Sequence, residues 1–422
     1  MENCKLNFLF ISADKFPPFR VDIAVLFGQE IVSRGHTIDL ILQSEKDCDI
    51  SYQTIWSGCR VWVGRTDNGS SRFARLRKHI YRIENNFRMF SLIRSQRYDF
   101  IQVKDEFISA ILAIIAAKLS RIKFIYWLSF PFPEASLYKV KEGTARYPIF
   151  YLVRGWVFKL VLYRLIMPLA DHIFVQSEQM KTDIMAMGID KEKLTPVPMG
   201  VSLQAIPQER VNNAFKQDKE LQTVVYLGTL ERVRRIDFLV RVIKKVLNNI
   251  PNIKLYLVGD GNDPADQEFI RHEAARLGIE DAVIITGFLP REEALKFVQQ
   301  ADVCVSPFYP TPILNSTSPT KLVEYMAMGK PTVANDHPEQ RLVIEESGGG
   351  ICVPYEESAF AKAILDLLAD SEKAKQMGIR GRQFVQQFRS YTKIADRVEN
   401  KYFMICNNKL RSSIKQGDDQ GV

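Results

Sequence analysis

Short β-branched runs alternate with helical patterns along this chain, and the alternation begins afresh in the second half. Strands are predicted in the first half at residues 7–12, 37–43, 99–103, 124–128 and 172–176. Strands are predicted in the second half at residues 223–227, 254–258, 283–286, 303–306 and 331–334. Strands separated by helices pair in parallel, because each connection must cross over the sheet. The sequence therefore predicts an α/β fold with two doubly wound, Rossmann-like domains facing each other across a cleft.

Helix boundaries are clearest in the second half. Helices are predicted there at residues 237–247, 265–277, 291–300 and 319–328. In the first half, apolar residues at helical spacing fill the stretch before Gly35, which is a natural helix stop. Ligands of such folds bind beyond the carboxyl ends of the strands, so the loops at those ends are the candidate sites.

The same patterns predict how the chain divides. The predicted parts are a first domain (1–201), a polar linker (202–219), a second domain (220–390), a helix returning to the first domain (391–406) and a disordered tail (407–422). The linker carries no apolar periodicity, which is typical of a loop. We expect it to act as a hinge, because the cleft of a two-domain enzyme closes on its substrate.

Composition limits the classes of protein that remain. With 46% hydrophobic and 25% charged residues among 422, the chain has ordinary globular composition. The formal charge of +8 permits phosphate-bearing partners or an anionic membrane surface. No uncharged apolar run reaches the ~18 residues of a membrane-spanning helix. Six cysteines without metal or redox spacing predict reduced thiols in a cytoplasmic protein.

The segment 315–331 carries the most information about a site. Ser318 is a strong N-cap residue, Pro319 fits the first helical position, and Gly329 fits the position after the helix. The helix follows an apolar strand, so its N-terminus is predicted at the carboxyl end of that strand. An anion at such a helix start is stabilised by about 0.3–1 kcal/mol.

Lys321 falls in the first turn of this helix, where a cation opposes the helix dipole. This local misfit is explained if an anion occupies the site. Thr320, Lys321 and Glu324 lie on one helix face, because residues three and four apart are neighbours. The alternative is an ordinary lysine–glutamate surface pair on a capped helix.

Two further loops follow strands of the second half. Gly228 leads into a loop with Arg232, Arg234 and Arg235, whose guanidinium groups suit phosphate; the alternative is a solvated basic loop. The next loop holds Gly259 and Asp260 but lacks the third glycine of a dinucleotide fingerprint. Alone it is a tight turn, and its incompleteness argues against a nicotinamide-dependent oxidoreductase.

Several stretches of the second half, in this order, resemble the second domain of family 4 retaining glycosyltransferases of GT-B architecture. The matching stretches are ADHIFVQSE, PVPMGVS, VVYLGTLERVRRIDFLV, LYLVGDG, VIITGFLPREE, ADVCVSPF, SPTKLVEYMAMGKPTVA and GGGICVP. The chain resembles in particular the branch with the pattern SP-x-KL-x-EYMA-x-GKP. The first half resembles the family more loosely, through GHTIDLIL.

The resemblance implies roles for individual residues. Glu324 matches the glutamate that holds the donor's ribose, and Ser316 stands where the family has a paired glutamate. The family's phosphate-binding pair maps to Thr229 and Arg234, and Arg232 is a candidate replacement for the lost arginine. Backbone groups near Phe288 and Leu289 match the loop that contacts the base.

The implied reaction moves a sugar from a nucleotide diphosphate to a hydroxyl group with retained configuration. Arg234, Lys321 and Glu324 are the expected catalytic residues. The expected nucleotide-sugar-binding residues are Gly228, Thr229, Arg232, Gly259, Asp260, Phe288, Leu289, Ser316, Ser318, Pro319 and Thr320. No cofactor and no metal are expected, and the D-x-D sequence at 47–49 is interpreted as a chance acidic turn.

Two segments of the first half suggest attachment to an anionic membrane surface. Residues 72–97 combine eight basic residues with an apolar stripe at helical spacing. Residues 147–170 are aromatic and apolar but interrupted by cations. The alternative for both is a helix packed in the core. The same apolar interleaving argues against nucleic-acid binding.

The sequence therefore predicts a glycosyltransferase with a nucleotide-sugar donor, preferably UDP-linked, and a glycan or lipid-linked acceptor. It is expected in cell-surface polysaccharide or glycolipid synthesis, on the inner face of the cytoplasmic membrane. The alternative is a catalytically decayed sugar-nucleotide-binding or scaffold subunit, which the replacements Ser316 and Thr229 leave open.

Overall fold

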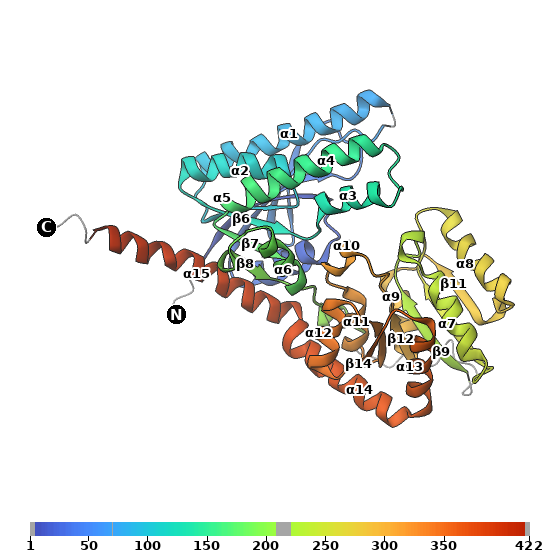
Figure 1. Ribbon diagram of the computed structural model, residues 1–422. Coiled ribbons are helices and arrows are strands. Elements are labelled where there is room, and N and C mark those ends of the chain that lie inside the picture. Colours follow the sequence, from blue (N-terminus) through green and yellow to red (C-terminus); the bar gives the residue numbers. More distant parts are fainter. Residues whose placement is uncertain (1–4, 70, 208–220, 418–422) are drawn as a thin grey trace. The chain divides into compact units, whose positions relative to one another are not determined.

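The computed structural model describes residues 5–69, 71–207 and 221–417. It divides into two compact units, the first comprising Met1–Pro198 with Ile394–Val422 and the second Met199–Lys393 (Figure 1). Most of the predicted linker at 202–219 lies outside the described residues. The part that is described belongs to the second unit and includes a short turn, η4 (Leu203–Ala205).

The first unit is built on an eight-stranded sheet in the order β3-β4-β2-β1-β5-β6-β7-β8. The strands are β1 (Asn7–Phe16), β2 (Thr37–Ser44), β3 (Tyr52–Trp56), β4 (Cys59–Gly64), β5 (Phe100–Lys104), β6 (Lys123–Leu128), β7 (His172–Val175) and β8 (Leu194–Pro196). Neighbouring strands are parallel except β3, which pairs antiparallel with β4. The predicted strands of this half are confirmed, whereas β3, β4 and β8 are strands that sequence reasoning missed.

Helices cover both faces of this sheet. They are η1 (Asp22–Ile31), α1 (Arg72–Ser95), α2 (Phe107–Ser120), α3 (Phe132–Lys141), α4 (Pro148–Val161), η2 (Leu162–Ile166), α5 (Met167–Leu169), α6 (Glu178–Ala186), η3 (Lys191–Lys193) and α15 (Tyr391–Gly417). Successive side chains of a strand point to opposite faces. Leu9 of β1 packs in one core cluster with Met89 of α1, and the neighbouring Phe8 packs against Tyr402 of α15, with ring centroids 4.8 Å apart. The doubly wound prediction is thus confirmed for this unit.

Helix α15 packs in the first unit from Ile394 onward. The buried hydroxyl of Tyr402 hydrogen-bonds the side chain of Gln102 on β5. The carboxylate of Glu399 accepts a hydrogen bond from Arg34 at 2.6 Å. The helix continues to Gly417, past residue 406, where the sequence predicts the ordered chain to end.

The second unit is built on a six-stranded parallel sheet in the order β11-β10-β9-β12-β13-β14. The strands are β9 (Gln222–Leu227), β10 (Ile253–Val258), β11 (Val283–Gly287), β12 (Val303–Ser306), β13 (Thr332–Asn335) and β14 (Gly350–Val353). The helices are η5 (Arg232–Arg234), α7 (Asp237–Leu247), α8 (Pro264–Leu277), η6 (Glu280–Ala282), α9 (Arg291–Gln300), α10 (Pro312–Asn315), α11 (Thr320–Ala327), α12 (Pro338–Ser347), α13 (Glu357–Ala369), α14 (Ser371–Phe384) and η7 (Val385–Arg389). All predicted strands and helices of this half are confirmed, with α7 and α9 at the predicted bounds.

Candidate functional site

Two glycines close the carboxyl ends of β9 and β10 in the second unit. Gly228 has φ +150° and Gly259 has φ +146°, conformations that residues with a β-carbon rarely adopt. A β-carbon on Gly228 would lie 2.3 Å from Cε of Lys321, and one on Gly259 would lie 2.0 Å from the carbonyl oxygen of Gly228. The missing side chain of Gly228 therefore leaves room for the lysine to extend across the end of β9, and that of Gly259 leaves room for the backbone of Gly228.

Lys321 is a partly buried cation among aromatic rings. Its Nζ lies 4.9 Å from the ring centroid of Tyr226 and 5.2 Å from that of Phe308. Burial, and next the positive charge of Arg234, lower the pKa of Lys321 to about 7, against the opposing effect of Glu324. Within the described part of the chain no carboxylate lies at ion-pair distance from Lys321. Neighbouring cations of this kind are stabilised when an anion joins them.

The three arginines of the loop after β9 have different surroundings. Nε of Arg235 lies 3.3 Å from Oδ1 of Asp237. The guanidinium of Arg232 lies over the ring of Phe269, 5.0 Å from its centroid. Arg234 forms no ion pair with a carboxylate of the described residues. Among the described residues, neither Arg232 nor Arg234 forms an ion pair with a carboxylate, but Arg232 lies over a ring, whereas the charge of Arg234 acts on Lys321. The interpretation of Arg232 as a substitute phosphate ligand stays a prediction.

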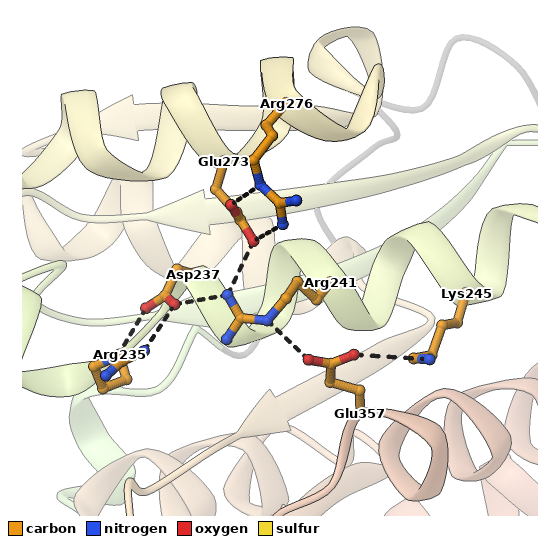
Figure 2. Close-up of polar contacts among 7 residues, drawn as sticks. All are labelled: Arg235, Asp237, Arg241, Lys245, Glu273, Arg276 and Glu357. Atoms are coloured by element: carbon orange, nitrogen blue, oxygen red, sulfur yellow. Dashed lines mark hydrogen bonds and ion pairs between the residues drawn. The ribbon is translucent and has the colours of Figure 1, made fainter.

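Asp237, the partner of Arg235, belongs to a network of charged residues around α7 (Figure 2). Arg241 lies at its centre, 2.8 Å from Asp237, 3.0 Å from Glu273 and 2.8 Å from Glu357. Burial alone would lower the pKa of Arg241, but its hydrogen bonds to these three carboxylates raise it. The network links α7 to α8 and α13, so its charges are used within the protein.

The start of α11 differs from the prediction in one respect. Ser318 does not cap the helix: its hydroxyl oxygen instead accepts the backbone N–H of Met199 at 3.0 Å. The prediction of a serine N-cap is therefore wrong, and Pro319 stands at the cap position rather than in the first turn. Because no side chain caps α11, its first N–H groups, starting at Thr320, remain without a capping partner. Gly329 ends the helix with φ +69°, as predicted.

Glu324 is paired, but with Arg291 rather than with Lys321. Nη2 of Arg291 donates to Oε1 of Glu324 at 2.7 Å. The glutamate side chain is 14% exposed and the arginine side chain 51% exposed. The alternative of a lysine–glutamate surface pair is therefore wrong. Sequence reasoning missed Arg291 because the two residues lie on different helices.

The loops after β10 and β11 meet at Asp260. Its carboxylate accepts hydrogen bonds from Gln267 at 2.6 Å and from the N–H of Gly261 at 2.7 Å. These bonds, first that of Gln267, lower the pKa of Asp260, and the backbone N–H of Phe288 contributes in the same direction. The Phe288 side chain is 81% exposed, and Leu289 beside it is partly buried. Asp260 thus fixes the backbone of the loop that the resemblance assigns to the base.

The two positions that depart from the family pattern have contrasting environments. Thr229 is exposed, and its carbonyl oxygen accepts the hydroxyl of Tyr226 at 3.1 Å. Ser316 is 4% exposed and stands at the C-cap of α10. Neither residue supplies a charge where the family has one.

Sequence reasoning missed a buried charged cluster at the carboxyl ends of β1 and β5 in the first unit. The side chain of Lys104 is 1% exposed, and its Nζ lies 2.6 Å from Asp22 and 3.4 Å from Asp14. The signal in the sequence is the charged run of residues 104–106 directly after a strand. Only the fold shows which acids face the lysine, because these come from β1 and the helix that follows it.

Asp105, next to this lysine, has a strained backbone. Its φ of +57° is uncommon for a residue other than glycine. Its carboxylate accepts the N–H of Ser129 at 2.8 Å and lies 3.9 Å from Nη1 of Arg20. Burial raises the pKa of Asp105, against the opposing effects of Lys104 and of these hydrogen bonds. Strain of this kind often marks functional positions.

The two segments predicted to meet a membrane form α1 and α4. Apolar residues of α1 are exposed at 73, 76, 80 and 87. On α4 the exposed large apolar residues are Ile149, Phe150, Leu152, Val153, Trp156, Val157 and Leu160, which recur at helical spacing and are called here the α4 apolar face. Gly155 alone is buried in α4, so the alternative of a buried helix is wrong for residues 148–161. It holds for the rest of that segment, where Leu162 and Ile166 are buried in the core, and α1 likewise packs Met89 in the core while its other side is exposed. No helix within the described ranges is both long and apolar enough to cross a membrane.

The acidic turn at 47–49 has a structural explanation. Oδ1 of Asp47 accepts the N–H of Asn68 at 2.6 Å, and Cys48 and Thr66 exchange backbone hydrogen bonds. Across the residues that the structure describes, no three His, Cys, Asp or Glu side chains are grouped to hold a metal ion.

Comparison of the coordinates with solved structures defines the class. The chain resembles sucrose-phosphate synthase of Thermosynechococcus elongatus with a TM-score of 0.72, 20% identity and coverage of 96% of this chain and 100% of that one. It resembles Anabaena HepE in complex with UDP with a TM-score of 0.67, 14% identity and coverage of 94% and 99%. At such identities the likeness concerns the fold alone, which is that of two-domain, GT-B glycosyltransferases.

Comparison of sequences defines the family. The model of the group 1 glycosyl transferases matches residues 207–384, and that of a glycosyl transferase 4-like domain matches residues 26–200. The chain therefore belongs to the group 1 glycosyltransferases.

Two curated relatives carry names that mention lipids. Alpha-monoglucosyldiacylglycerol synthase of Streptococcus pneumoniae is 23% identical over 80% of this chain and 72% of that one. A GDP-mannose-dependent phosphatidylinositol monomannoside mannosyltransferase of Mycolicibacterium smegmatis is 27% identical over 47% of this chain and 50% of that one. This second match thus spans about half the length of the relative.

Proposed function

We propose that this protein transfers a sugar from a nucleotide diphosphate donor to a hydroxyl group of a lipid-linked or glycan acceptor. The observation that carries the proposal is Lys321: a partly buried ammonium group between two aromatic rings, with Arg234 nearby and no carboxylate partner among the described residues. A diphosphate is the kind of anion that would satisfy both cations at the carboxyl edge of a parallel sheet.

In this proposal the second unit stabilises the leaving group. Negative charge accumulates on the diphosphate as the glycosidic bond breaks. Lys321, Arg234 and the uncapped N–H groups at Thr320 meet that charge with fixed donors, which is an effective form of catalysis. The proposed reaction draws on these protein groups and needs no metal. Retention of configuration is proposed from the family resemblance alone.

The remainder of the donor is assigned to neighbouring loops. Glu324 offers its second carboxylate oxygen to the ribose hydroxyls while Arg291 holds the first. The loop at Phe288 and Leu289, fixed by Asp260, offers backbone groups to the base. UDP is the preferred nucleotide in this proposal, and the similarity to a UDP complex of HepE supports that choice.

The acceptor is proposed to be carried by a lipid at the cytoplasmic face of a membrane. The α4 apolar face is exposed, and α1 is rich in arginine and lysine. Both features suit contact with anionic lipid, where each surface cation contributes about 1 kcal/mol. The names of the two lipid-related relatives support the same substrate class. Flotation with liposomes tests this part: recovery should depend on anionic lipid, and equal, negligible recovery with and without it would contradict the idea.

The alternative function is that of a sugar-nucleotide-binding subunit without turnover. The replacement of charged residues of the family by Ser316 and Thr229 favours this alternative. Turnover separates the two. The purified protein should be warmed with a panel of nucleotides and nucleotide sugars, since a ligand at 100 times its Kd adds about 2.7 kcal/mol of stability. The stabilising donor should then be hydrolysed or transferred. Binding without turnover of any donor, with any lipid extract as acceptor, would favour the binding subunit.

A further inference from the structure

A cavity of about 480 Å³ lies in the first unit, lined by residues of α1, α3, α4 and the start of α2. Pockets that hold small molecules commonly measure about 300–1,000 Å³, so this one has room for a ligand. It lies at the carboxyl end of the sheet, because Asp105 directly follows β5 and lines it. The residues assigned above to the nucleotide donor belong to the other unit.

The cavity has an apolar wall. The rings of Phe107 and Phe158 stack with centroids 4.5 Å apart, and Ile83 and Phe132 also line the space. Phe158 belongs to α4, the helix whose exposed side is the α4 apolar face. A ligand that fills this cavity therefore gains from a hydrocarbon portion.

The two carboxylates that line the cavity, Glu106 and Asp105, already have partners within the protein. The guanidinium of Arg82 donates to Oε1 of Glu106, with Nε at 2.9 Å. Asp105 accepts hydrogen bonds from Ser129, and the neighbouring Lys104 offsets its charge. Arg82 thus offsets the charge of Glu106, and burial raises the pKa of Asp105, which disfavours its charged form.

Arg154 is the cation that remains. Its Nη2 donates to the hydroxyl of Ser136 at 2.9 Å, and its guanidinium lies 4.8 Å from the ring centroid of Tyr151. Its Nε is buried and has no hydrogen-bond partner among the described residues, and no described carboxylate forms an ion pair with it. Arg154 is half-buried, and a buried N–H without an acceptor is unfavourable, so an anion in the cavity would remove that penalty.

We propose that this cavity binds a lipid phosphate, with the phosphate on Arg154 and the hydrocarbon against Ile83, Phe107 and Phe158. The inference deepens the proposed function, on which it rests for its part in transfer, because it gives the acceptor a chemical class: an amphiphile with a phosphate next to its chain. Two sources share this chemistry, isoprenyl phosphates and diacyl phosphatidates.

Calorimetric titration of the full chain with soluble probes tests the proposal. The probes are geranyl phosphate, dihexanoyl phosphatidate, geraniol and inorganic phosphate. At least one lipid phosphate should bind ten times more tightly than geraniol or inorganic phosphate, and the tighter of the two identifies the source. Equal affinity for geraniol would show a merely apolar pocket, and equal affinity for inorganic phosphate would show a simple anion site. Either outcome overturns the proposal.

Variants localise the binding. Arg154→Gln should weaken the lipid phosphate at least tenfold, and Ile83→Trp, which fills the cavity, should do the same without changing charge. Lys159→Gln is the matched control, because it removes one cation from the same helix outside the cavity; it should change affinity less than twofold. Unchanged binding by both cavity variants, or an equal loss in the control, would overturn the proposal.

Donor binding is measured on the same samples to separate the two proposals. If the nucleotide binds and turns over while no lipid phosphate binds, the cavity inference fails alone. If lipid phosphate binds as described while no nucleotide binds, the proposed function fails alone. The nucleotide-induced thermal shift also shows that each variant is folded.

Discussion

Each unit of this protein places a lysine where parallel strands of its sheet end, and the two lysines have opposite surroundings. Lys104 in the first unit is 1% exposed and lies 2.6 Å from Asp22 and 3.4 Å from Asp14. Lys321 in the second unit lies over two aromatic rings, with Arg234 as its charged neighbour.

The difference separates a structural cation from a binding cation. The charge of Lys104 is satisfied by carboxylates that the protein supplies. The charge of Lys321 is left for a ligand, and the protein tolerates the cost of holding it. Removing the first lysine should therefore damage the fold, and removing the second should damage function.

Lys104→Met gives the largest expected effect. It leaves two buried carboxylates without their cation, which costs about 3–5 kcal/mol of unfolding free energy. Denaturant unfolding followed by circular dichroism measures this loss. The double variant Lys104→Met with Asp22→Asn should recover part of it, because one uncompensated acid is removed. A loss under 1 kcal/mol in the single variant would end the structural assignment of Lys104.

Lys321→Met should reduce turnover without reducing stability, the reverse of the effect expected for Lys104→Met. Turnover of the donor should fall by about 10²–10³-fold, the usual cost of one preorganised donor to developing charge. Unfolding free energy should stay constant or rise, because a poorly solvated charge is removed. Lys296→Met, an exposed position on α9, is the control with the same change in net charge. A destabilised Lys321→Met protein with normal turnover would break the comparison between the two lysines.

Arg234→Gln and Arg235→Gln compare an unpaired with a paired arginine in the same loop. A charge-assisted hydrogen bond contributes about 1.5–3 kcal/mol, so nucleotide diphosphate affinity should fall at least tenfold in the first variant. Arg235 already bonds Asp237, and its loss should leave affinity within about threefold. Titration calorimetry compares the two, and a larger loss for Arg235→Gln would reassign the phosphate ligand.

Glu324→Ala should weaken nucleotide binding about tenfold and leave the fold intact, because it removes an acceptor for the ribose hydroxyls. The wild-type protein should lose a similar factor with a 2′-deoxy nucleotide, and the variant should not distinguish the two nucleotides. Arg291→Gln keeps the carboxylate and loses only a half-exposed ion pair, so its effect should be smaller. Affinity unchanged in Glu324→Ala would refute the assigned role.

The smallest effect is a dependence on pH. Because the pKa of Lys321 is lowered from 10.5 to about 7, the ammonium form that binds diphosphate is lost as pH rises above 7. Affinity should fall several-fold between pH 7 and 8.5 in the wild type, and this fall should be absent in Lys321→Met. The free energy of unfolding should instead rise with pH in this range. Between pH 7 and 10.5 the unfolded state holds the proton of Lys321 and the folded state does not. Parallel pH profiles of affinity for both proteins would contradict the assignment.

The sequence predicts the second unit well because its signals are local. Helix α7 occupies its predicted residues, and Gly329 ends α11 as its lack of a side chain suggests. The hairpin of β3 and β4 was not predicted, although its strands are joined by a tight turn with Ser57 and Gly58 at positive φ. Strand β3 is mostly exposed, so it lacks the continuous apolar run that marks the buried parallel strands.

Contacts between distant residues account for the errors at the site. Ser318 suits a helix cap by every local rule, yet the N–H of Met199 uses its hydroxyl. The pairing of Glu324 with Arg291 and that of Lys104 with Asp22 likewise join separate elements. Residue type and spacing identified candidate ligands, whereas the fold decided which charges are already paired.

The structure of a complex with a nucleoside diphosphate would show whether Lys321 and Arg234 bind the diphosphate. The measured quantity is the distance from Nζ of Lys321 to the nearest diphosphate oxygen. We expect a charge-assisted hydrogen bond of about 2.7–2.9 Å, with Arg234 on the same diphosphate. A diphosphate bound elsewhere, with Lys321 still held over the rings of Tyr226 and Phe308 and touching no phosphate oxygen, would contradict it.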